Sequence, residues 1–140
     1  MPDAEGFKAS AGHGVDCTVN GTHIVMGSAR LMREQGIGNP LEEKAAALSA
    51  EGKTPIYMAA DGKLTALFAV ADAIKPDAAE AIRLLKEMNV KLVMLTGDNS
   101  LTAKAVAAKV GIDEVRSEVL PGDKAGEVAR LQNMGYTVAM

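Results

Sequence analysis

The sequence is short of aromatic residues, cysteines and long apolar runs, and each shortage excludes a class of protein. Aromatic residues make up 3% of the 140 positions, with no Trp, so the core must be built from aliphatic residues and Met. Cys17 is the single cysteine, which excludes an internal disulfide and fits a reducing compartment. No run approaches the roughly 18 apolar residues that a membrane-spanning helix needs, and the first residues lack the pattern of a signal peptide.

A basic surface and a metal-ligand pattern are also missing from the sequence. The net charge is −3 and the pI is near 5.4, which argues against a nucleic-acid partner. The eight Met residues are scattered singly, so we interpret them as core packing rather than copper ligands, and we predict no metal site. The remaining composition, 48% hydrophobic and 24% charged, is typical of a soluble globular protein of one ordinary domain or two small ones.

The first half of the chain predicts an antiparallel sheet with helices inserted. Asn20-Gly21 and Asp61-Gly62 each separate two strand-like runs, and both pairs tolerate the positive φ angles of a tight hairpin. Ser28 is placed to cap a short helix. Asn39-Pro40 predicts the start of a second helix, with Pro at the first helical position, and Gly52 predicts its end.

The second half changes to an alternation of helices and strands. Pro76 opens an expected helix, and the apolar run KLVML at 91–95 is typical of a strand covered on both faces. A helix is predicted over 100–110, another after Pro121, and YTVAM at 136–140 is expected to begin a strand. Such alternation implies a parallel sheet with right-handed crossovers.

The change of pattern places a domain boundary near Ala71–Lys75. Residues 1–71 are then an antiparallel, hairpin-rich unit, and residues 72–140 are a parallel, Rossmann-type unit. The fold class is therefore α/β. The sequence ends at Met140 inside an expected core strand, so we expect both units to be partial.

Two stretches resemble phosphate motifs but stand in the wrong structural context. Residues 47–54 match a relaxed Walker A pattern, yet a helix precedes the loop and a strand follows it, the reverse of what phosphate binding requires. We therefore interpret Lys53 as a turn residue. The stretch Gly122–Gly126 is similar to the Asp-Lys-Thr-Gly-Thr signature of enzymes that phosphorylate their own aspartate. Asp123, however, enters a helix instead of ending a buried strand, so we interpret it as a first-turn acidic residue.

The stretch Thr96-Gly97-Asp98-Asn99 does stand in the required context. It follows an apolar strand and opens a helix, so its hydroxyl and amides can hydrogen-bond an anion at the carboxyl edge of a parallel sheet. The alternative is an ordinary capped turn, in which Asn99 or Ser100 only satisfies free amides of the helix. The tetrapeptide by itself leaves both interpretations open.

Three stretches together resemble one known family: GHGV at 12–15, TGDN at 96–99 and LPGDKAGEVARLQNMGYTVAM at 120–140. With them, the sequence resembles the cytoplasmic ATP-handling region of heavy-metal-transporting P-type ATPases, the copper exporters most closely. The likeness covers nearly the whole chain. It implies a partial nucleotide-binding domain over 1–71 and a partial phosphorylation domain of the HAD type over 72–140. It also implies a parent that is an integral membrane ATPase, with this region on the cytoplasmic side and with ATP and Mg²⁺ as cofactors.

The resemblance implies roles for particular residues. Gly12-His13-Gly14-Val15 is similar to the Gly-x-Gly loop beside adenine, with a bulge before a hairpin as the alternative. Thr96, Gly97 and Asp98 match the phosphate-side loop of the family. Lys124 matches the lysine that neutralises the transferring phosphoryl group, with a plain surface lysine as the alternative.

Other family features are altered or missing. Ser28 replaces the usual Asn of a Val-Gly-Asn segment, and neither His13 nor His23 lies in the Ser-Glu-His-Pro context that orients adenine. The phosphorylated Asp and the main Mg²⁺ ligands are not in the sequence either. Because phosphoryl transfer depends on those groups, we expect this chain alone to be inactive and to bind ATP weakly, at roughly millimolar levels.

Two other classes of function stay open. A HAD-type phosphatase would require an Asp-x-Asp loop, and no two Asp residues stand two apart. A free-standing, non-catalytic nucleotide-binding or interaction module is the other alternative. The expected partners are ATP and the remaining cytoplasmic and transmembrane parts of the transporter, and exposed sheet edges predict dimerisation.

Overall fold

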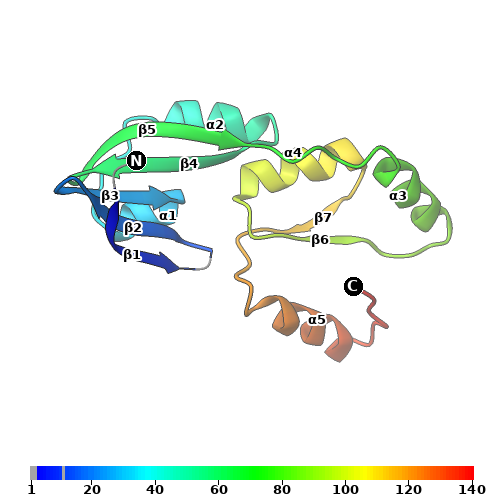
Figure 1. Cartoon of the computed structure of the whole chain (residues 1–140). Coiled ribbons are helices and arrows are strands. Elements are labelled where there is room, and N and C mark those ends of the chain that lie inside the picture. Colours follow the sequence, from blue (N-terminus) through cyan, green and yellow to red (C-terminus); the bar gives the residue numbers. More distant parts are fainter. Residues whose placement is uncertain (1–2, 11) are drawn as a thin grey trace.

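The computed structural model describes residues 3–10 and 12–140, and over these residues the chain forms two separate sheets (Figure 1). In the described part of the first half, five antiparallel strands pair in chain order: β1 (Ala4–Ser10), β2 (Gly14–Val19), β3 (Thr22–Gly27), β4 (Thr54–Ala60) and β5 (Lys63–Val70). The second sheet pairs β6 (Val93–Leu95) with β7 (Glu114–Arg116) in parallel. The helices are α1 (Ala29–Glu34), α2 (Glu42–Ala50), α3 (Ala78–Glu87), α4 (Ser100–Val110) and α5 (Lys124–Asn133). The predicted α/β fold class, antiparallel first and parallel second, is confirmed.

Both predicted hairpins are present, for the predicted reason. Asn20 and Gly21 have φ angles of 50° and 79° between β2 and β3, and Asp61 and Gly62 have 46° and 75° between β4 and β5. Two successive positive φ angles give the turn a twist that matches the flanking strands. Ser28 also caps α1 as predicted, because its hydroxyl accepts a hydrogen bond from the Leu31 amide at 3.3 Å.

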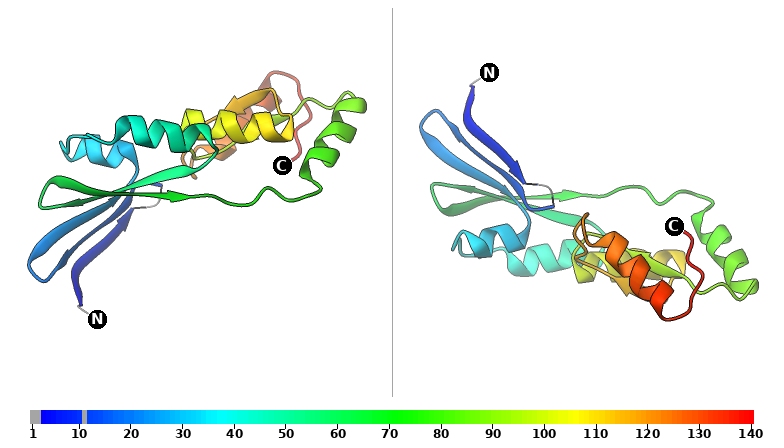
Figure 2. Two further views of the ribbon diagram at one scale, coloured as in Figure 1. Left: turned by 90° about the horizontal axis from the view of Figure 1, so that it is seen from above. Right: turned by 90° about the horizontal axis from the view of Figure 1, so that it is seen from below.

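The hydrophobic core lies between the antiparallel sheet and the helices α1 and α2, which cover one face of it (Figure 2). Residues of β4 alternate between buried and half-buried, and Tyr57 and Ala59 point into the core. Met32 of α1 is 1% exposed and is the largest fully buried side chain there. Aliphatic residues and Met therefore do replace aromatic packing, with Tyr57 as the exception.

The second half is packed more loosely. Ala103, Ala107 and Val110 of α4 are buried, but among the described residues none in α3 or α5 is. A cavity of about 620 Å³ separates β6 from α5 and from the segment 136–140. No helix in the described ranges is both long and apolar enough to cross a membrane.

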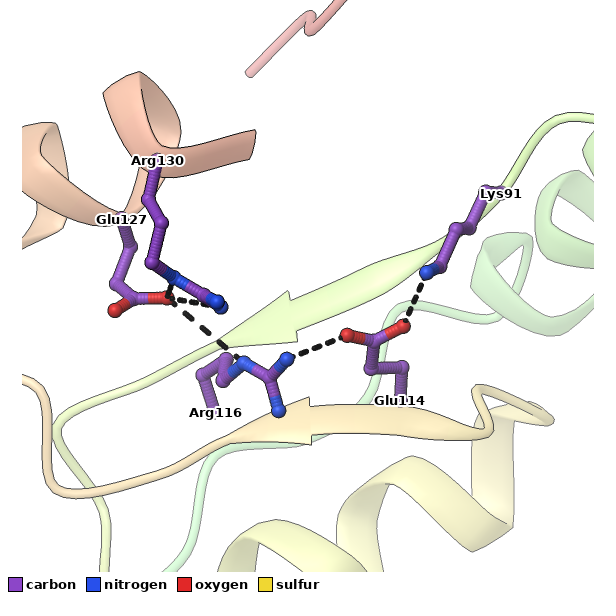
Figure 3. Close-up of polar contacts among 5 residues, drawn as sticks. All are labelled: Lys91, Glu114, Arg116, Glu127 and Arg130. Carbon is purple, nitrogen blue, oxygen red and sulfur yellow. Dashed lines mark hydrogen bonds and ion pairs between the residues drawn. The ribbon is translucent and has the colours of Figure 1, made fainter. Parts of the chain in front are cut away.

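Charged side chains link the second sheet to α5 (Figure 3). Glu114 lies 2.9 Å from the Lys91 ammonium and 2.7 Å from the Arg116 guanidinium. Glu127 of α5 lies 3.8 Å from Arg116 and 3.1 Å from Arg130. The hydrogen bond to Lys91 lowers the pKa of Glu114, and the same bond raises the pKa of Lys91. Of these pairs, Arg116–Glu127 is the one that joins the sheet to α5.

Three local predictions differ from the structure. The second helix begins at Glu42, not at Pro40, because the Asn39 carboxamide accepts from the Leu41 amide at 3.3 Å in a turn ahead of the helix. Strand β1 was not predicted, since each of its residues is exposed and no apolar alternation marks it. The strand expected at 136–140 is absent, because no neighbouring strand lies within reach to pair with it across the cavity.

Candidate phosphate-binding site

The loop Thr96-Gly97-Asp98-Asn99 lies at the carboxyl edge of the parallel sheet, between β6 and α4. The Thr96 amide donates to the Arg116 carbonyl at 2.9 Å, which extends the pairing with β7 by one residue beyond the strand. The predicted strand–loop–helix context of this tetrapeptide is therefore correct. Anions bind in such loops because helix amides and the helix dipole face the strand ends.

Internal hydrogen bonds fix the shape of this loop. The Thr96 hydroxyl donates to Asp98 Oδ2 at 2.8 Å and lies 3.1 Å from the Asp98 amide, which donates to it. The segment after β7 closes the loop from outside, as the amides of Glu118 and Val119 donate to the carbonyls of Asp98 and Thr96 at 2.9 and 3.1 Å. The hydroxyl of Thr96 is thus pre-positioned, and an anion would replace Asp98 as its acceptor.

Asn99 begins α4 as its N-cap. Its carboxamide oxygen accepts from the Thr102 amide at 3.0 Å, in the manner of an ordinary helix cap. The amides of Ser100 and Leu101 have no acceptor among the residues that the structure describes. The two interpretations of the tetrapeptide are therefore compatible, because Asn99 satisfies one first-turn amide and leaves two others without an acceptor among the described residues.

A residue from the first half completes the loop. Thr54, the first residue of β4, donates its hydroxyl to Asp98 Oδ1 at 2.7 Å. Sequence reasoning missed this contact, although Thr54 is the last residue of the Walker-like stretch. In the structure that stretch is the end of α2 followed by β4, and Lys53 pairs with Glu51 at 2.5 Å, so the rejection of a Walker loop agrees with the observed order.

The block Gly12-His13-Gly14-Val15 covers the turn before β2 and the first two residues of β2, and Gly12 faces the second half. A Cβ atom on Gly12 would lie 3.5 and 3.6 Å from side-chain atoms of Leu120 and Pro121, so this loop contacts the segment that leads to α5. Gly14 lies opposite Gly27, and a Cβ on Gly14 would lie 2.2 Å from the Met26 carbonyl oxygen. The close approach of β2 and β3 therefore requires Gly14, and Gly12 and His13 form a turn directly before it.

Lys124 and Asp123 stand at the start of α5. Lys124 is half-buried, and its side chain makes no hydrogen bond or ion pair within the described part of the chain. Asp123 is the N-cap of α5 in a helical conformation and its side chain makes no capping bond. Neither parallel strand in residues 12–140 is followed directly by Asp, and Asp123 opens a helix, as predicted, instead of ending a strand. The bonds from Glu118 and Val119 to the loop are what hold the start of α5 near it.

The residues present do not form a magnesium site by themselves. Within residues 3–10 and 12–140 no cluster of three metal-ligating side chains exists. Asp98 is a single carboxylate, and each of its oxygens accepts a hydroxyl hydrogen bond. Mg²⁺ prefers carboxylates and water in octahedral geometry, so further ligands would have to come from elsewhere.

Comparisons with known proteins agree with this arrangement, in which a polar loop joins a parallel strand to a helix beside an antiparallel unit. Residues 2–140 match the haloacid dehalogenase-like hydrolases, and the chain belongs to that family. It is 45% identical, over an alignment of 142 residues that covers all of this chain, to the "Probable copper-exporting P-type ATPase V" of Mycobacterium tuberculosis (strain ATCC 25618 / H37Rv). It is 41% identical over 136 residues, 96% of this chain, to the "Copper-exporting P-type ATPase" of Staphylococcus aureus (strain N315). The chain spans 18% and 17% of these two relatives.

Solved structures with a similar fold come from the same group. A zinc-transporting PIB-type ATPase in the E2.Pi state matches 96% of this chain and 21% of its own, with a TM-score of 0.53 and 30% identity. The catalytic domain of the CPx-ATPase CopB-B matches 96% of this chain and 45% of its own, with a TM-score of 0.71. At 21% identity the second match shows the fold alone. The resemblance to heavy-metal P-type ATPases is confirmed.

Proposed function

We propose that this chain is part of the cytoplasmic catalytic region of a copper-exporting P-type ATPase, an integral membrane transporter, and that it binds ATP. Alignments that cover all and 96% of this chain, with two relatives named as copper-exporting P-type ATPases, support the assignment. The observation that carries the site is the Thr96–Asn99 loop, preformed by hydrogen bonds at the carboxyl edge of the parallel strands. A phosphatase is less well supported, because neither β6 nor β7 leads directly into an Asp.

The two halves take different parts of the nucleotide in this proposal. Residues 1–71 are the partial nucleotide-binding domain, in which Gly12-His13-Gly14-Val15 lies on the adenine side. Residues 72–140 are the partial phosphorylation domain, in which Thr96, Gly97 and Asp98 face the transferring phosphoryl group and Lys124 compensates its charge. The contact of Gly12 with Leu120 and Pro121 supports this division, because it brings the two loops to one side of the molecule.

The chain's own residues hold and stabilise a phosphoryl group but do not receive it. In this proposal the Thr96 hydroxyl and the amides of Ser100 and Leu101 donate hydrogen bonds to the phosphoryl group, and Lys124 adds a positive charge. Mg²⁺, when bound with ATP, supplies charge neutralisation between the phosphates, with ligands mainly from the remaining parts of the transporter. The accepting aspartate also belongs to those parts, so we expect no ATP hydrolysis by the isolated chain.

The test is aspartyl-phosphate formation from labelled ATP in the transporter that contains this chain. Lys124→Ala should slow formation by about 10²–10³-fold, the usual cost of losing one preorganised charge or donor. Lys104→Ala is the matched control, because Lys104 is an exposed lysine on α4. Asp123→Asn should form the acid-stable intermediate at the normal rate. Equal rates for Lys124→Ala and Lys104→Ala would overturn the role of Lys124.

A further inference from the structure

Hydrogen bonds between polar side chains join the two halves beside the phosphate loop. The end of α2 and the start of β4 lie against α4, as Figures 1 and 2 both show. Ser49 of α2 and Thr102 of α4 are 3% and 1% exposed, so their hydroxyls are shielded from water. The Asn99 carboxamide donates to Ser49 Oγ at 3.3 Å and to Thr102 Oγ1 at 2.8 Å, and Thr102 donates to the Lys53 carbonyl at 2.8 Å.

Thr54 extends this network to the charged residue of the loop. It follows Lys53 directly, and its hydroxyl donates to Asp98 Oδ1 at 2.7 Å, while Thr96 donates to Oδ2. The buried bonds of Asn99 and Thr102 fix the backbone on both sides of this contact. The carboxylate of Asp98 is therefore held between one hydroxyl from each half, with little freedom to rotate.

We propose that Thr54 is a positioning residue for the phosphate loop, which acts through Asp98. Until an anion replaces Asp98 as the acceptor, Thr54 at Oδ1 keeps Oδ2 bonded to the Thr96 hydroxyl and disperses part of the carboxylate charge. Without the Thr54 hydrogen bond, the Asp98 side chain rotates and no longer holds the Thr96 hydroxyl in one orientation. The contact also makes the loop sensitive to where the nucleotide-binding half sits, because Thr54 moves with β4.

The first test uses the 140-residue chain and does not depend on the proposed function. Thr54→Val removes the hydroxyl and keeps the branched shape, whereas Thr54→Ser keeps the hydroxyl. Thr65→Val is the matched control, since Thr65 is another threonine of the sheet whose hydroxyl donates to a backbone carbonyl, that of Met58, at 3.1 Å. Amide NMR shifts of Thr96–Asn99 should move in Thr54→Val and return in Thr54→Ser. Unmoved loop shifts in a folded Thr54→Val chain would overturn the proposal, and Thr54→Ala replaces it if Thr54→Val does not fold.

The second test rests on the proposed function and measures aspartyl-phosphate formation in the transporter. Thr54→Val should slow formation about tenfold, the effect of one hydrogen bond to a charged group, and leave the KM for ATP within twofold. In an Asp98→Ala background Thr54→Val should add no further slowing, because the carboxylate through which Thr54 acts has been removed. An equal slowing in both backgrounds overturns action through Asp98. A normal rate for Thr54→Val beside a slow Lys124→Ala would refute this inference alone, whereas a normal Lys124→Ala would refute the proposed function.

Discussion

Replacing Thr102 by Val tests whether the polar contact between the halves is an obligatory part of the fold. Thr102 is 1% exposed, and its hydroxyl donates to the Lys53 carbonyl and accepts from the Asn99 carboxamide, both at 2.8 Å. Val has nearly the same shape as Thr but cannot make either bond. The substitution therefore leaves a carbonyl oxygen and an amide proton without these partners and creates no large cavity.

The expected loss of unfolding free energy is about 2 kcal/mol. A buried polar group left unsatisfied costs about 1–3 kcal/mol, whereas a made hydrogen bond contributes only about 1 kcal/mol net. Asn99 keeps Ser49 as an acceptor, so most of the loss comes from the carbonyl of Lys53, which has no other partner among the described residues. The helix cap itself survives, because it uses the backbone amide of residue 102.

Urea unfolding followed by circular dichroism measures the loss of unfolding free energy, and tyrosine fluorescence shows which half of the chain unfolds more easily. Tyr57 lies in the core of the first half and Tyr136 follows α5, so the two tyrosines report on different halves. Thr65→Val, which removes an exposed hydroxyl hydrogen bond, should change stability by less than about 0.5 kcal/mol. A Thr102→Val loss no larger than that of Thr65→Val would refute the reasoning.

Two further predictions concern the second half. The hydrogen bond to Lys91 lowers the pKa of Glu114 from its usual 4.5. The stabilisation that the ionised Glu114 carboxylate gives the fold is therefore complete above pH 4.5 and is lost as the pH falls through the folded pKa. The melting-temperature difference between the unmodified chain and Glu114→Gln should shrink from neutral pH toward about pH 3. The pKa of Lys91 is raised, so its own contribution holds below its usual 10.5 and is lost only at more alkaline pH. Because β6 pairs on one side only within the described residues, its free edge should promote dimerisation, and light scattering that shows a monomer at every concentration would contradict this.

Features set by neighbouring residues could be predicted from the sequence. The hairpin turn at Asn20-Gly21 needs two residues that accept positive φ, and both are adjacent. Helix α4 begins after Asn99 and ends before Gly111, whose φ of 85° is the left-handed cap expected of glycine. The Thr96–Asn99 loop was proposed as a phosphate site in the same way, because an apolar strand, a polar corner and a helix follow one another directly along the chain.

Features set by distant residues could not be predicted. Thr54 and Asp98 are 44 positions apart, and a hydroxyl at the start of a strand gives no sign of which carboxylate it will meet. The segment 136–140 has a strand-like composition, but a strand also needs a neighbour, and the cavity beside β6 leaves it without one. Gly14 posed a different difficulty, because a nucleotide loop and a close approach of two paired strands both require glycine, and the sequence does not show that Gly14 lies opposite Gly27.

The charge of Asp98 limits what the loop can bind by itself. A carboxylate and one phosphate charge about 4 Å apart repel each other by about 4 kcal/mol at an effective dielectric constant near 20. The dipole of α4 offsets only about 0.3–1 kcal/mol of this. A phosphoryl group at this loop therefore needs a nearby cation, and Lys124 is the candidate, because Glu118 and Val119 tie the approach to α5 to the loop. Binding then depends on β4, α4 and α5 together, which is why the tetrapeptide alone is consistent with both a phosphate site and an ordinary capped turn.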